Sequence, residues 1–163
     1  MSDLPLRIRQ NPIYLSNWAS RKTPGHHGPG RKWTIMAKPR HWEQGAGQVA
    51  ALTPLTNDLV SVRGGLISAG EYKARYLQLV EAWCNTSSRF SPHHPLAQGI
   101  LRARRRRSGA QFGFGLAVVA GGDTLCCACS RAAAAQGECH RVWAAELLRD
   151  AGWRVILDGE ELT

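Results

Sequence analysis

The sequence lacks any run of about 18 consecutive apolar residues, the length that a membrane-spanning helix needs. Its first residues, MSDLPLRIRQNP, also lack the apolar stretch of a secretory signal. We therefore expect a cytoplasmic protein with no membrane partner. The chain has five cysteines, and an odd number in that compartment favours reduced thiols over a disulfide framework.

Several catalytic and nucleic-acid-binding signatures are absent as well. The chain has no phosphate-binding loop G-x-x-x-x-G-K-[ST] and no G-x-S-x-G turn. The zinc-deaminase pattern is incomplete, because no proline precedes Cys126 and Cys129. No helix-turn-helix, zinc-finger or RNA-recognition motif is present, so sequence-specific reading of nucleic acid is not expected.

Acidic residues are scarce in most of the chain. Residues 1–122 contain 17 basic and 5 acidic residues, whereas residues 123–163 contain 4 basic and 7 acidic residues. The formal net charge is +9, which favours a polyanionic partner such as nucleic acid or a phosphorylated substrate. The length of 163 residues, 44% of them hydrophobic, fits a single domain over 1–163.

Apolar periodicity predicts an α/β fold in which a mostly parallel sheet is flanked by helices. The helix expected within 48–65 has Leu52, Leu55, Leu59 and Val62 at helical spacing and stops at Gly64. The next helix, 68–84, has Ser68 as its N-cap. A helical turn or two is expected within 96–109. Strands are expected within 11–20, 32–39, 114–130 and 153–159, and a C-terminal helix within 139–152, closed by Gly152.

The C-terminal elements form a predicted strand-loop-helix-strand unit. In parallel sheets, sites gather where strands end and loops lead into helix N-termini. The segment GDTLCCACSRAAAAQGECHR, residues 122–141, occupies that position. If TLCCAC is extended, Cys127 and Cys129 point to one face and Cys126 to the other, so we expect Cys126 in the core.

Three interpretations of this segment stay open. Cys127, Cys129 and Cys139 are candidate zinc ligands, and Cys126 with Cys129 forms a C-x2-C pair. Alternatively, Cys139 is a reactive thiol with a lowered pKa, since it opens a helix beside His140 and Arg141. In the third interpretation the cysteines only fill the sheet as small apolar residues.

The stretches YLSNWASRK, ALTPLTNDLVSVRGGLISAGEYKARYLQLV and LCCAC…CHRVWAAELLRDAGWRV together resemble the DUF488 family of small α/β proteins. The resemblance covers most of the chain, and its most specific part is CHR with the preceding cysteine strand. It implies an α/β fold and a shared pocket. Two stretches depart from the family pattern, GHHGPGRK and RARRRR. The pocket residues implied by position are Ser16, Asn17, Arg21, Cys127, Cys129, Cys139, His140 and Arg141.

Basic residues mark a possible nucleic-acid-binding surface. The run RARRRR would neutralise several phosphates, and the nearby Trp33 and Trp42 would offer stacking for an unpaired base. The alternative is a solvated basic loop that only aids solubility. The residues expected to contact nucleic acid are Lys32, Arg40, Arg102, Arg104, Arg105, Arg106 and Arg107.

The paired histidines His26 and His27 lie in a glycine-rich loop. They can act as acid or base, contact substrate or join a metal site, or they can simply be solvated. The leading hypothesis is an enzyme that acts on or modifies nucleic acid or a nucleotide-like substrate. Cys139, His140, Arg141, Cys127 and Cys129 would be its catalytic residues. The competing hypothesis is a non-catalytic, basic nucleic-acid-binding protein in which a cysteine cluster, with or without zinc, stabilises the fold.

Overall fold

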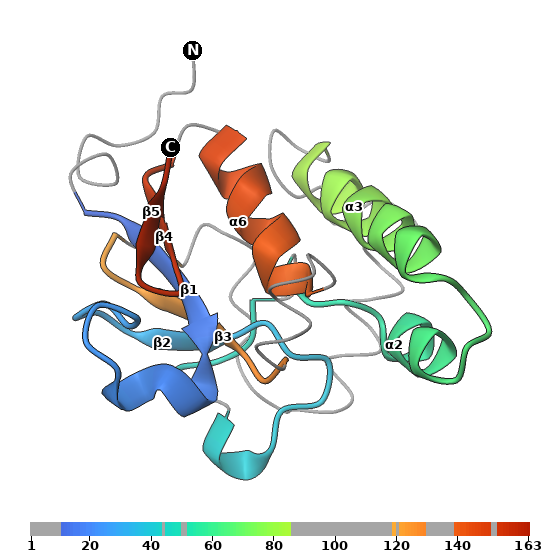
Figure 1. Ribbon diagram of the computed structural model, residues 1–163, viewed down its shortest axis with the longest axis horizontal. Helices are drawn as coiled ribbons and strands as arrows, with labels where there is room; N and C mark the ends of the chain where they lie inside the picture. The colour runs from blue at the N-terminus through green and yellow to red at the C-terminus, as the bar shows by residue number, and fades with distance from the viewer. Residues whose placement is uncertain are drawn as a thin grey trace.

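The computed structural model describes residues 11–43, 45–49, 52–85, 119, 121–129, 139–150 and 153–163. These residues contain a five-stranded sheet with the strand order β2-β3-β1-β4-β5 (Figure 1). The first four strands in this order are parallel, and only β5 is antiparallel to its neighbour. The predicted α/β fold with a mostly parallel sheet is confirmed. The strands are β1 (Ile13–Asn17), β2 (Lys32–Thr34), β3 (Thr124–Cys127), β4 (Val155–Leu157) and β5 (Glu160–Leu162).

The central strands are buried on both faces, as parallel strands covered by other elements usually are. Every residue of β3 is buried, and Ile13 and Leu15 of β1 are fully buried. Strand β1 lies between β3 and β4, so the C-terminal unit crosses over β1 to return to the sheet. The predicted order of strand, helix and strand is therefore correct, although its two strands are not neighbours.

Helices α3 (Ala69–Asn85) and α6 (His140–Asp150) account for most of the described helical residues (Figure 1). Helix α6 packs against β1, β3 and β4, and α3 packs against α6. Tyr72 and Tyr76 of α3 meet the Trp143 ring of α6 at centroid distances of 5.3 and 5.6 Å. The predicted cap of α3 is confirmed, because the Glu71 N–H donates to Ser68 Oγ at 3.1 Å.

The helix predicted within 48–65 is shorter than its apolar spacing indicates. The structure places α2 at Thr56–Arg63, and the buried Leu52 is separated from it by the non-helical residues 53–55. Pro54 explains the difference, since proline disfavours helical backbone at the preceding residue and donates no hydrogen bond. The predicted stop is correct: Gly64 caps α2, and its N–H donates to the Val60 carbonyl at 2.9 Å.

The strand predicted within 153–159 is in fact the first half of a hairpin. Strand β4 ends at Leu157, which pairs with Glu160 of β5 across the two-residue turn Asp158-Gly159. Both turn residues have positive φ, 49° and 89°, as a tight hairpin turn of this length requires. The turn sets Asp158 at the carboxyl end of β4. The predicted helical turns within 96–109 and the predicted helix stop at Gly152 lie outside the described residues.

Candidate active site

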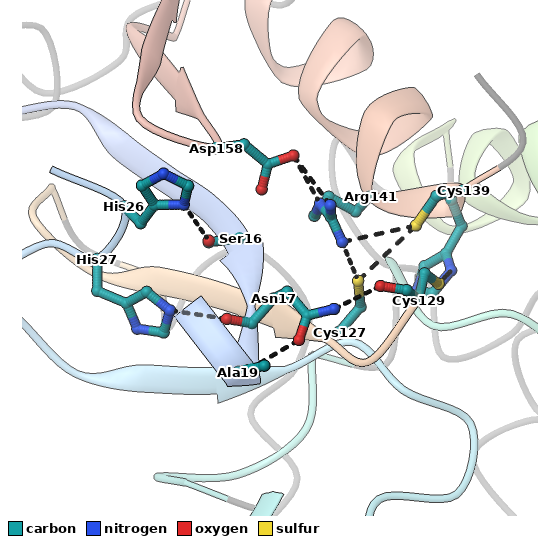
Figure 2. A network of polar contacts seen from close by, with 11 residues as sticks. Ser16, Asn17, Ala19, His26, His27, Cys127, Cys129, Cys139, Arg141 and Asp158 are labelled. Carbon is teal, nitrogen blue, oxygen red and sulfur yellow. Dashed lines mark hydrogen bonds and ion pairs between the residues drawn. The ribbon is translucent and has the colours of Figure 1, made fainter. Parts of the chain in front are cut away.

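The candidate site lies where β1, β3 and β4 end and α6 begins, as Figure 2 shows. The last residues of these strands are Asn17, Cys127 and Leu157, and His140 opens the helix. The carboxyl edge of a parallel sheet is the usual position for a site in this fold class. The structure therefore brings the predicted cysteine segment and the early Ser16-Asn17 pair together at one edge.

Three cysteine sulfurs converge at this edge. The Sγ atoms of Cys127, Cys129 and Cys139 lie within 4.8 Å of one another, and those of Cys127 and Cys139 are 3.7 Å apart. Cys127 and Cys139 are buried, whereas Cys129 is half-buried and connects the cluster to solvent. The predicted alternation is confirmed. Cys126 is fully buried outside this cluster, so the proposed C-x2-C ligand pair of Cys126 with Cys129 is wrong.

Arg141 connects this cluster to the β4-β5 hairpin. Its Nη1 donates to Cys127 Sγ at 2.9 Å, and its Nε and Nη2 donate to Asp158 Oδ2 at 3.2 and 2.9 Å (Figure 2). The Arg141 side chain is only 1% exposed, so its charge must be balanced inside the protein. Asp158 supplies one negative charge, and a Cys127 thiolate would supply another.

The three thiols differ in acidity. Hydrogen bonds from Cys129 and Cys139, together with the positive charge of Arg141, hold the pKa of Cys127 well below its usual range. The hydrogen bond to Cys127 and burial raise the pKa of Cys139 to about 12. Hydrogen bonding to the other two thiols and burial also raise the pKa of Cys129. The lowered pKa predicted for Cys139 is therefore wrong; it belongs to Cys127, which Arg141 contacts directly.

His140 is fixed as a neutral ring. Its Nε2 donates to the Ile35 carbonyl at 2.9 Å, and its Nδ1 lies 3.7 Å from Cys129 Sγ. Burial lowers the pKa of His140, so the ring is neutral and Nδ1 carries the lone pair. The Tyr76 ring packs edge-on against it at 5.7 Å. His140 can therefore accept a proton or hydrogen bond only on the Cys129 side.

Asn17 links the end of β1 to the end of β3. Its Nδ2 donates to the Cys129 carbonyl, and its Oδ1 accepts from the Ala19 N–H at 2.8 Å. The second contact caps the 3-10 helix η1 (Trp18–Lys22). With both ends of its amide engaged, Asn17 positions the Cys129 backbone. Arg21, the other predicted contact in this segment, is exposed on η1.

The histidine loop lies beside β1 (Figure 2). His26 Nδ1 is 3.4 Å from Ser16 Oγ, and His27 Nε2 donates to the Asn17 carbonyl at 3.0 Å. A Cβ atom at Gly159 would lie 3.0 Å from His26 Cδ2, so this ring packs against the hairpin turn. Burial lowers the pKa of His27. Both rings are half-buried, and their contacts connect the histidine loop to the end of β1 and to the hairpin turn.

The predicted nucleic-acid-binding residues are divided among different environments. Arg40 is exposed and Lys32 is half-buried in β2, whereas Trp33 is buried and its Nε1 donates to Asp123 Oδ2 at 2.8 Å. The predicted stacking role of Trp33 is therefore wrong. Trp42 is 61% exposed. The arginines of the basic run, Arg102, Arg104, Arg105, Arg106 and Arg107, lie outside the described residues.

Asp158, the ion-pair partner of Arg141, was not among the site residues predicted from the sequence. Its signal was the dipeptide Asp-Gly after an apolar strand, which is typical of a two-residue hairpin turn. A turn at that point ends β4 at the carboxyl edge of the sheet, where an acidic side chain faces the start of α6.

The three clustered cysteines can also hold a metal ion. A zinc–sulfur distance of about 2.3 Å places two ligands of a tetrahedral site about 3.8 Å apart. The 3.7 Å between Cys127 and Cys139 fits that spacing. Among the described residues, no fourth His, Cys, Asp or Glu ligand joins the three sulfurs within 4.8 Å. Three thiolates and an open fourth position are the arrangement that these residues offer.

Comparison with family models, curated proteins and solved structures finds no match to this chain. The resemblance to the DUF488 family therefore stays a prediction. No helix in the described part of the chain is long and apolar enough to span a membrane. The function has to be argued from the site itself.

Proposed function

We propose that this protein is an enzyme that acts on a nucleic acid or a nucleotide-like substrate, with the Cys127 thiolate as nucleophile. The contact between Arg141 Nη1 and Cys127 Sγ at 2.9 Å carries the proposal. A buried guanidinium stabilises a thiolate, which is the reactive form of cysteine. The carboxyl edge of the parallel sheet is also where enzymes of this class place their substrates.

The proposed step is a nucleophilic substitution. Cys127 Sγ forms a bond to an electrophilic atom of the substrate, and the bond from that atom to the leaving group breaks. The leaving group keeps the electron pair and takes a proton from the Cys139 thiol, whose Sγ lies 3.7 Å from Cys127 Sγ. Water then displaces Cys127 from the covalent intermediate, and its released proton restores the Cys139 thiol.

In this proposal Arg141 stabilises the thiolate and does not contact a substrate phosphate. Its Nη1 points to Cys127, and its Nε and Nη2 point to Asp158. These contacts stabilise the thiolate, and the substrate phosphate needs other cations. Residues 11–57 supply six basic residues and only one acidic residue, so the segments after β1 and β2 can provide them.

The test is alkylation of the native protein by iodoacetamide near neutral pH, followed by peptide mapping. We expect Cys127 to react faster than Cys126, because both thiols are fully buried and only Cys127 is contacted by the Arg141 guanidinium. Cys126 is the internal control, since it is adjacent and buried, and burial raises its pKa to about 12. Equal rates at Cys127 and Cys126 would contradict the thiolate proposal.

The substrate class is tested in the same assay. A single-stranded oligonucleotide or a nucleoside triphosphate is expected to slow the alkylation of Cys127 when it occupies the site. If neither probe protects Cys127 at any concentration, the enzyme does not act on this class of substrate.

The convergence of three sulfurs within 4.8 Å favours a second candidate, a basic nucleic-acid-binding protein with a zinc–thiolate centre. Zinc would be held by Cys127, Cys129 and Cys139 and would supply folding free energy. Metal analysis of the natively purified protein separates the two candidates. About one zinc per chain, lost together with thermal stability on chelation, supports the second; metal-free protein with a fast-reacting Cys127 supports the first.

A further inference from the structure

The segment after β2 carries an exposed aromatic ring beside a cation. Trp42 lies in the 3-10 helix η2 (His41–Glu43), and the Arg40 guanidinium carbon is 5.4 Å from the centre of its ring. Within the described ranges, four large apolar side chains are exposed, and Trp42 is the aromatic one among them. An indole this exposed contributes little to the core and is accessible to a ligand.

The backbone around Trp42 is held in place although its side chain is in solvent. Glu43 is buried, its Oε2 accepts from the Arg40 N–H at 2.9 Å, and its own N–H donates to the Arg40 carbonyl at 2.9 Å. These reciprocal hydrogen bonds close the turn on both sides of Trp42. His41 packs edge-on against the indole, with ring centroids 6.3 Å apart. The ring is thus presented in advance on a fixed turn, which lowers the entropy cost of binding.

The surroundings of Trp42 select a negatively charged, aromatic ligand. Its sequence neighbours Lys38, Arg40 and His41 are all exposed, and Glu43, the nearest acidic residue in the sequence, is buried. No large apolar side chain accompanies Trp42 in this turn, as a lipid surface or an apolar protein interface would require. A planar base with an adjacent phosphate matches both the ring and the cations.

We propose that Trp42 and Arg40 form a stacking site for an unpaired base of single-stranded nucleic acid. The base stacks on the indole, and the neighbouring phosphates lie near Arg40 and Lys38. Duplex DNA does not fit, because its bases are already stacked on one another. The inference rests on the proposed function only in taking nucleic acid as the substrate class.

The stacking site and the thiols belong to the same side of the molecule. The segment leaving β2 is tied to the site at Ile35, whose N–H donates to the Cys126 carbonyl and whose carbonyl accepts from His140, both at 2.9 Å. Six residues later the chain enters η2, which Figure 1 shows on the side toward which β1 points. A single-stranded nucleic acid bound at Trp42 would therefore lie near the sheet edge that carries Cys127.

The test is fluorescence anisotropy of a labelled single-stranded oligothymidine with wild-type protein and three variants. We expect Trp42→Ala to weaken binding on the order of tenfold, because one stacking partner is lost, and Trp42→Phe to restore most of the affinity. Arg63→Ala is the matched control, an exposed arginine on α2 that should have a smaller effect. Equal affinity of wild type and Trp42→Ala would overturn the inference, as would equal binding of a duplex of the same length or no binding by the wild type.

The outcome is separable from that of the proposed enzyme. The alkylation rate of Cys127 is measured in the wild type without oligonucleotide, so it does not depend on the stacking site. A slow Cys127 together with weakened binding by Trp42→Ala would refute the catalytic proposal and leave the stacking site standing. Fast alkylation of Cys127 together with unchanged oligonucleotide binding by Trp42→Ala would refute the stacking site and leave the catalytic proposal standing.

Discussion

Two arginine ion pairs on the same hairpin have different environments. Arg141 is 1% exposed and pairs with Asp158 at the turn, which is 32% exposed. Arg154 and Glu161 face each other across β4 and β5 and are 44% and 42% exposed. The donor and acceptor groups are the same in both pairs. Only Arg141 has lost its water, and it also contacts a sulfur, that of Cys127.

This difference in exposure indicates that the Arg141 contacts matter more for stability than the Arg154–Glu161 pair. Exposed ion pairs gain little, because water and salt screen them. A buried guanidinium, in contrast, has given up its hydration and is stable only if each of its donors meets an acceptor. Arg141 meets that condition through Asp158 and Cys127. The hairpin turn thus stabilises the charge that keeps Cys127 ionised.

Removing the buried cation should have the largest effect. Arg141→Ala leaves Asp158 and Cys127 without their counter-charge, and we expect a loss of about 3–5 kcal/mol in the free energy of unfolding, measured by urea titration. Arg141→Lys keeps the charge without the forked geometry and should lose less. If the Arg141→Ala protein is as stable as the wild type and Cys127 is still acidic, the buried arginine is no more important than the exposed Arg154.

Removing the buried pair's anion should have an intermediate effect. Asp158→Asn keeps an acceptor oxygen and tolerates the positive φ of the turn, but it removes the charge. We expect a loss of about 1–3 kcal/mol in the free energy of unfolding, since Arg141 keeps only Cys127 as a charged partner. Asp150→Asn at the exposed end of α6 is the control and should be near neutral. Equal effects at the two positions would refute the importance of Asp158.

The free energy of unfolding should depend on pH because His140 is buried. Burial lowers the pKa of His140 in the folded protein, so below about pH 6.5 the unfolded chain binds a proton that the folded protein does not. Stability should therefore fall as the pH drops through this range and level off below the folded pKa. The slope from one proton is at most about 1.4 kcal/mol per pH unit.

His140→Gln tests this titration directly, because its amide N–H can still donate toward the Ile35 carbonyl but does not titrate. The difference in unfolding free energy between wild type and this variant should shrink as the pH falls below 6.5. A difference that is the same at every pH would show that His140 titrates normally in the folded protein.

The smallest effect is expected at the exposed pair. Glu161→Gln removes the charge opposite Arg154 and should leave the thermal midpoint almost unchanged in moderate salt. A loss comparable to that of Asp158→Asn would mean that burial does not separate the two pairs.

Much of the site followed from local rules that the sequence displays. The period-two alternation of a strand separated Cys126 from Cys127 and Cys129, and the helix start after the cysteine segment located Cys139, His140 and Arg141. Both rules depend only on backbone geometry near the residues concerned. They were sufficient to bring the three thiols to one edge of the sheet.

The predictions failed where contacts between residues far apart in the sequence determine the environment of a side chain. The acidic thiol is Cys127 instead of Cys139, because the guanidinium of Arg141 reaches back across the strand end. Trp33 is buried because Asp123, 90 residues away in the sequence, accepts its indole N–H. Asp158 was missed although its Asp-Gly turn is a local signal. No local pattern, however, reports which side chain a hairpin turn will face.

The most direct test of the central claim is the ultraviolet absorbance of the thiolate, at about 240 nm, in metal-free native protein near neutral pH. Wild type and Cys126→Ser should show the signal of about one thiolate, and Cys127→Ser should lose it. If Cys127→Ser keeps the signal, or if the wild type shows none until the pH approaches that of ordinary thiols, Cys127 is not the ionised group at this site.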